Sequence, residues 1–187
     1  MAKYDLSDVF YLDTSLSLGT DFDAGTQVSS VLDVSSYVNP IGQGRSKGTG
    51  LAVYKVWMDV TVAAGNDAPL AADNGQFRAG LISFSGAPAA AVGSASLSSN
   101  VLNASNDLMI AGVDFKGGGS AAGDPWPKTF LEPSIEVPYV VVRDQVALMI
   151  SVTTAMGSAA SVKCRLEVAQ VTLDQSTLNQ LLRTQTV

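Results

Sequence analysis

The 187-residue chain contains no histidine and a single cysteine, Cys164. Without histidine, it cannot carry Ser-His-Asp or Cys-His nucleophilic catalysis, a histidine-zinc site or a haem held by a proximal histidine. One cysteine allows no disulfide within the chain, no CxxC pair and no cysteine-bound cluster. We therefore expect no enzyme, no catalytic residue, no metal site and no cofactor.

Charge is also scarce, since only 15% of the residues are charged while 47% are apolar. Soluble domains usually have about 25% charged residues, so much of this surface must consist of small neutral side chains or be covered by another molecule. The 17 acidic and 11 basic residues leave a net charge of −6. The length suits one domain with a sizeable core. This composition favours assembly over chemistry.

Long apolar runs are missing as well. Asp5 and Asp8 interrupt the first segment, which excludes a signal-peptide core there, and no window approaches the roughly 18 apolar residues of a membrane span. We expect a protein that is made in the cytoplasm of the producing cell, and the lone Cys164 is compatible with a reducing compartment.

The chain is rich in apolar alternation with a period of two residues, which is typical of half-buried β-strands. The pattern is clearest at 51–63, 145–154 and 161–169, and weaker at 26–34, 76–84, 108–115 and 135–142, with a short pairing expected near 10–18. In the first of these strands, Tyr54, Val56 and Met58 are expected on one face. Trp57 is expected on the opposite face.

Seven or eight strands joined by loops of unequal length predict an all-β sandwich with crossing connections. The chain lacks the Cys…Trp…Cys spacing of an immunoglobulin domain, so we predict an eight-stranded jelly roll over residues 26–173. Residues 1–25 are expected to form an extended N-terminal arm. Residues 174–187 are expected to form a short helix and a tail, with Asp174 or Ser176 as the helix cap.

A glycine-rich segment at 42–50 has the look of a phosphate-binding loop. Its lysine, Lys47, precedes Gly48 instead of following a glycine, and the segment leads into a strand instead of a helix. We therefore interpret it as a loop that presents Arg45 and Lys47 to a partner surface.

Two further motifs could belong to the domain core or to a contact between subunits. Trp126 stands between two prolines that hold its backbone extended, and an intersubunit pocket would suit its ring as well as the domain's own core would. A leucine stripe on the C-terminal helix could pack on its own domain or in the groove of a partner. The candidate subunit-interface residues are Arg45, Lys47, Trp126, Leu178, Leu181 and Leu182.

Acidic residues could also form a cation-binding site. Asp13, Asp21 and Asp23 could supply oxygen ligands to a cation, but their spacing does not match an EF-hand. Basic residues are scattered, and the first 40 residues contain only Lys3. A coat protein that packages RNA directly usually has a basic arm, so we expect no direct contact with nucleic acid.

The strand 51–63, the strand start at 137–140, the strands 145–154 and 161–173 and the closing segment 171–186 together resemble a single jelly-roll major capsid protein of an icosahedral virus. With no basic arm, the resemblance is to bacterial or archaeal viruses of the membrane-containing type. It implies a structural capsid protein, located in the virion, that self-assembles through lateral contacts into capsomers. The implied partners are copies of itself, other capsid proteins and an internal lipid membrane.

Two alternatives remain open. One is a virion decoration or spike protein, and the other is a carbohydrate-binding jelly-roll module. A sugar-binding module exposes a row of aromatic side chains on one sheet face. Here aromatic residues make up 7% of the chain, and Tyr54 and Trp57, which share one strand, are expected on opposite faces, which weakens this alternative.

Overall fold

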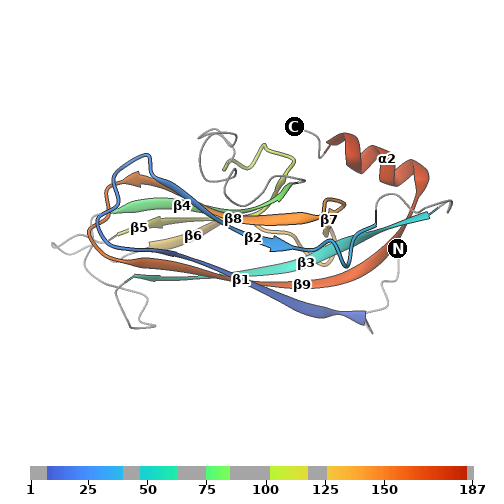
Figure 1. Cartoon of the computed structure of the whole chain (residues 1–187), viewed down its shortest axis with the longest axis horizontal. Coiled ribbons are helices and arrows are strands. Elements are labelled where there is room, and N and C mark those ends of the chain that lie inside the picture. The colour runs from blue at the N-terminus through green and yellow to red at the C-terminus, as the bar shows by residue number, and fades with distance from the viewer. Residues whose placement is uncertain (1–7, 40–46, 63–74, 85–101, 118–125, 185–187) are drawn as a thin grey trace.

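The computed structural model describes residues 8–39, 47–62, 75–84, 102–117 and 126–184, which form two packed antiparallel sheets and one helix (Figure 1). The elements are β1 (Phe10–Leu18), β2 (Gln27–Asp33), β3 (Lys47–Val62), β4 (Gln76–Phe84), β5 (Met109–Lys116), β6 (Trp126–Leu131), β7 (Tyr139–Val141), β8 (Gln145–Thr154), β9 (Ala160–Asp174) and α2 (Gln175–Thr184). The one helix among these residues is too short and too polar to cross a membrane.

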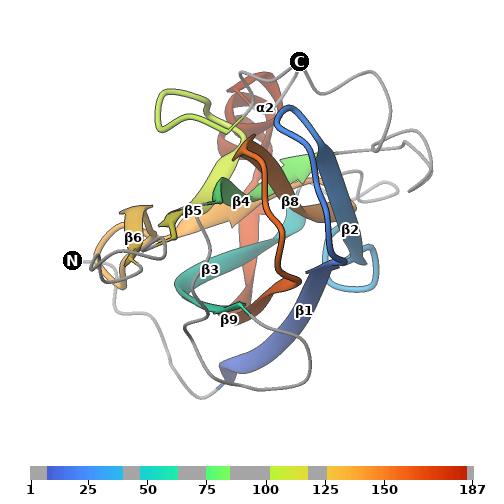
Figure 2. The ribbon, with the colours of Figure 1, turned by 90° about the vertical axis from the view of Figure 1, so that its left-hand side faces the viewer.

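The strand order identifies the fold. One sheet runs β1-β9-β3-β7 and the other β2-β8-β4-β5-β6. Early strands pair with late ones, β1 with β9, β2 with β8 and β3 with β7, as in a long hairpin rolled up on itself. That nesting defines a jelly roll, and Figure 2 shows its two layers. The predicted all-β jelly roll is confirmed, with β6 added at a sheet edge to make nine strands in the described part of the chain.

The core fills the space between the two sheets. Alternate side chains of each strand point inward, as the period-two pattern predicts. Leu51, Leu81, Leu148 and Leu166 have no exposed surface, and each contributes about 1.5–3 kcal/mol through removal from water.

The faces of β3 differ from the prediction because the strand contains a bulge. Pairing with β9 shifts register between Val53 and Lys55, so Tyr54 is the extra residue. Val53 and Val56 both reach the core between the sheets. Tyr54 is buried with Ala52 and Ala169 on the outer side of the sheet, so its expected place beside Val56 was wrong. Apolar residues on both sides of the bulge hide it from a simple alternation count.

The N-terminal segment differs from the predicted extended arm. Residues 10–18, which we expected within the arm of residues 1–25, form β1 and pair with β9 along their whole length. Phe10, Leu12 and Leu16 pack against the core, and Leu18 is buried within it. These inward apolar side chains make β1 part of the sandwich, as the pairing expected near 10–18 had indicated.

The C-terminal helix lies at one end of the sandwich, directly after β9 (Figure 1). Asp174 caps it, because the backbone N–H of Thr177 donates to Asp174 Oδ1 at 2.7 Å. This hydrogen bond lowers the pKa of the Asp174 carboxyl. Leu178 is 1% exposed and packs with Val142 and Leu173.

Replacing Leu178 with alanine should therefore destabilise the whole domain. The cavity and the lost burial are expected to lower the free energy of unfolding by about 2–5 kcal/mol, measured by urea denaturation. Gln180→Ala, on the exposed side of the same helix, serves as the control and should leave the free energy nearly unchanged. Equal losses in the two variants would show that α2 does not pack on the sandwich.

Candidate functional site

Two of the three charged and aromatic candidates from the sequence fall within the described residues. Arg45 falls outside them. Lys47 is the exposed first residue of β3, in register with Asp174 of β9. Trp126 begins β6, where it is in register with Lys116 of β5, and its side chain falls outside the description. β3 and β6 belong to different sheets, and any role of these candidates between subunits stays a prediction.

The leucine stripe packs on its own domain. Leu178 is buried, while Leu181 and Leu182 are partly buried against the same cluster of Val142 and Leu173. Packing on its own domain, the first of the two interpretations of the stripe, therefore accounts for Leu178. Any role of these leucines between subunits stays a prediction.

A different surface stands out on the outer face of β1, β9 and β3. The pairing registers place three residues across it in each row. Tyr11, Glu167 and Lys55 form one row, Asp13, Arg165 and Trp57 the next, and Ser15, Lys163 and Asp59 a third. Three acidic and three basic side chains thus alternate within an otherwise acidic protein.

Arg165 is central to this face. Its Nε donates to Asp13 Oδ1 at 2.7 Å and its Nη2 to Asp13 Oδ2 at 3.4 Å, and the bond to Asp13 raises the pKa of the guanidinium. Its Cζ lies 5.8 Å from the centre of the Tyr11 ring. Both partners of the ion pair are 60% exposed, so the pair orients side chains more than it stabilises the fold.

Two aromatic rings meet over β9. The centres of the Tyr11 and Trp57 rings are 6.2 Å apart and the rings are tilted by 48°. Lys55 Nζ lies 4.9 Å from the centre of the Trp57 ring. The two rings, with Asp13, Arg165, Asp59 and Lys163, line an open hollow of about 800 Å³.

Sequence reasoning missed this surface. Trp57 was placed correctly on the polar face of its strand, but Tyr11 and Arg165 were not singled out. The signal was present, since Lys163, Arg165 and Glu167 alternate with apolar residues. What could not be seen was that β9 lies between β1 and β3, which brings residues 11, 57 and 165 together.

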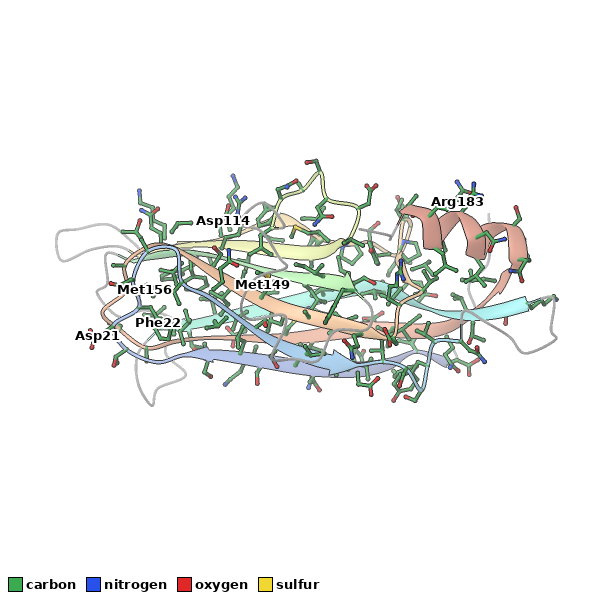
Figure 3. The ribbon with its side chains drawn as sticks, turned by 45° about the horizontal axis from the view of Figure 1, so that its top comes forward. Asp21, Phe22, Asp114, Met149, Met156 and Arg183 are labelled. Carbon is green, nitrogen blue, oxygen red and sulfur yellow. The ribbon has the colours of Figure 1, made fainter. Side chains whose placement is uncertain are left out.

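Part of the outer face of the other sheet is covered by the chain itself. Leu102 and Leu108 pack with Met149, and Phe130 packs against the same cluster. Figure 3 shows the place of Met149 in the sheet. Arg78 forms a two-bond ion pair with Asp114, with Nε–Oδ1 at 2.5 Å and Nη2–Oδ2 at 2.8 Å.

Phe130 is fixed between a cation and a glycine. The guanidinium of Arg78 lies 4.5 Å from the centre of the Phe130 ring. On the neighbouring strand, a Cβ added at Gly112 would come within 2.3 Å of Phe130 Cζ. Gly112 is therefore needed for close approach of the ring, which holds the edge strand β6 to β5.

Gly112→Ala should destabilise the domain by about 1–3 kcal/mol in urea denaturation, because the new methyl group would collide with the Phe130 ring and force it to move. Gly157→Ala, where no atom lies within 4 Å of the added Cβ, is the matched control and should change little. In a Phe130→Ala background the Gly112→Ala penalty should largely vanish. A penalty that persists there would contradict the collision.

Cys164 is a core residue. It is 2% exposed, and burial raises the pKa of its thiol to about 12. A thiol that stays protonated at neutral pH is a weak nucleophile. The negative charge of Asp13 adds to this rise in the pKa. Asp13 lies on β1, in register with Arg165, which follows Cys164 in β9.

The Cys164 thiol should resist labelling by a disulfide reagent at pH 8 until the protein is unfolded. Its raised pKa also predicts a pH effect on stability. Folded protein holds this proton more tightly than unfolded chain does, so the contribution is complete below the ordinary pKa of 9.0 and is lost as the pH rises toward about 12. Cys164→Ala should therefore show a smaller fall in the free energy of unfolding above pH 9 than the parent protein. Rapid labelling of folded protein would contradict this burial.

Two of the aspartates considered as cation ligands, Asp13 and Asp21, lie in different parts of the fold. Asp13 is bound to Arg165, on a strand. Asp21, with a φ of +62°, belongs to the loop at the end of the sandwich where Phe22 bridges Met156, remote from Arg183 (Figure 3). Within the described ranges there is no group of three residues that could hold a metal ion.

Comparison with known proteins finds no matching family model and no matching curated protein. Eleven chains of solved structures match. One is VP1 of Human Polyomavirus 12 in complex with 3'-sialyllactosamine, 8% identical over 89% of this chain and 99% of that chain, with a TM-score of 0.44. Another is VP1 of trichodysplasia spinulosa-associated polyomavirus in complex with GM1 oligosaccharide, 10% identical over 90% and 96%, with a TM-score of 0.42. TM-scores this low carry no weight for function, and the chain is assigned to the jelly-roll sandwiches by its strand order alone.

Proposed function

We propose that this chain is a structural capsid protein that self-assembles through lateral contacts into the capsomers of an icosahedral shell. The observation that supports it best is the jelly-roll strand order, which viral capsid domains and lectins share. The role is structural and not catalytic, and this part of the proposal rests on the absence of histidine from the sequence.

A short loop offers a surface for lateral contacts. Ile135 is 55% exposed and Val137 is 74% exposed, on the connection between β6 and β7. The N–H of Val137 donates to Ser134 Oγ at 3.1 Å, and Pro133 and Pro138 flank the segment. A stiff loop with two protruding apolar side chains loses little entropy when a neighbouring subunit covers it.

We also propose the finer assignment, a virus of bacteria or archaea whose shell encloses a membrane. It is supported by the charge distribution alone. Lys3 is the single cation among the first 40 residues, and two arginines of the described strands, Arg78 and Arg165, are paired with aspartates. A shell of such subunits would face lipid or other proteins more readily than naked phosphate.

The test is assembly of the purified protein, measured by size-exclusion chromatography with light scattering and by negative-stain microscopy. Capsomers or shells are expected, without co-purifying nucleic acid. Ile135→Asp and Val137→Asp should reduce assembly at least tenfold while the melting temperature changes by only about 2 °C or less, because an exposed charge disturbs contacts between subunits and not the core.

Ala104→Asp adds the same charge to an exposed turn elsewhere and should assemble normally. Deleting residues 1–19 is unsuitable as a test, because it would remove β1 and the buried Leu18. A parent protein that stays monomeric at every concentration would overturn the capsid proposal.

A further inference from the structure

The hollow on the outer face of β1, β9 and β3 has no part in the proposed assembly loop. It contains Tyr11, 55% exposed, and Trp57, 40% exposed, which contact each other across β9. Single exposed apolar residues are ordinary on protein surfaces, but two large rings gathered at one hollow mark a binding surface.

Both rings are held in place before any ligand arrives. Arg165 lies over Tyr11 while its two hydrogen bonds to Asp13 fix its own position, and Lys55 lies over Trp57. Each cation occupies one side of its ring. Side chains fixed in this way lose little conformational entropy on binding, so more of the contact energy appears as affinity.

Polar groups surround the rings in pairs of opposite sign. Asp13 and Arg165 meet in one row, and Asp59 and Lys163 are in register in the next. A carboxylate accepts and a guanidinium donates two hydrogen bonds each, which is the pattern that neighbouring hydroxyl groups require. At about 800 Å³, the hollow has the size of a small-molecule site.

Charge and shape select the ligand. Three acidic and three basic side chains balance on this face, so it offers no net attraction to a polyanion. A purely apolar ligand would strip water from those charges at a cost.

We propose that this hollow binds a saccharide without net charge, whose apolar C–H face stacks on Tyr11 and Trp57 while its hydroxyl groups bond to Asp13, Arg165 and Asp59. The stacking needs flat apolar area and the rim needs closely spaced hydroxyls, and a sugar ring supplies both. The site goes beyond the capsid role and does not depend on it.

The protein should be applied, as purified, to an array of immobilised neutral and acidic glycans. Binding to a set of neutral glycans is expected. For the strongest of them, Trp57→Ala and Tyr11→Ala should each weaken binding about tenfold, through loss of a stacking platform. Arg165→Lys keeps the charge but not the two-pronged hydrogen bonding, and should weaken binding several-fold.

Gln180→Ala, on the exposed side of α2 and outside the lining of the hollow, is the control and should bind as the parent does. The variants should assemble and melt like the parent protein. Four outcomes would overturn the proposal: no glycan binding, binding unchanged in Trp57→Ala and Tyr11→Ala, binding only to acidic glycans that is lost at high salt, or failure of these two variants to assemble. The last would make the hollow a contact between subunits. Assembly and glycan binding are separate readouts, so either proposal can fail alone.

Discussion

The structure depends on β9, which pairs with β1 on one side and β3 on the other. These pairings join residues such as Asp13 and Arg165, which are 152 positions apart. Non-local pairs of this kind must form against a large loop entropy, so the chain is expected to fold slowly compared with a helical protein of its size. Once β9 is in place, its inward side chains complete the core and its outward side chains complete the hollow.

The outer faces of the two sheets differ in how their apolar side chains are covered. The sheet β2-β8-β4-β5-β6 buries apolar side chains of its outer face, such as Met149, under Leu102, Leu108 and Phe130, so the chain itself covers this part of the face. The sheet β1-β9-β3-β7 keeps two aromatic rings and a balanced set of charges at its surface. An apolar side chain that the chain does not cover is available to a ligand or to another molecule. The exposed rings therefore place the proposed site on the sheet β1-β9-β3-β7.

Much of the fold could be predicted from local pattern. Alternation located the long strands, the N-cap at Asp174 was anticipated, and the leucine spacing indicated a helix that packs. The bulge at Tyr54 was missed because Val53 and Val56 are apolar on either side of it and both reach the core. The hollow was missed for a different reason: its lining residues come from three strands, and nothing local specifies which strands are neighbours.

The sequence by itself determined that this is an all-β sandwich with a short capped helix, and that histidine-based chemistry is absent. Those properties follow from composition and from periodicities of two and 3.6 residues, which need only near neighbours in the chain. Only the tertiary structure decided which strands are neighbours, and therefore which side chains of different strands lie together on one face of a sheet. Register across a sheet depends on contacts between residues far apart in sequence, and the hollow with Tyr11 and Trp57 exists because of those contacts.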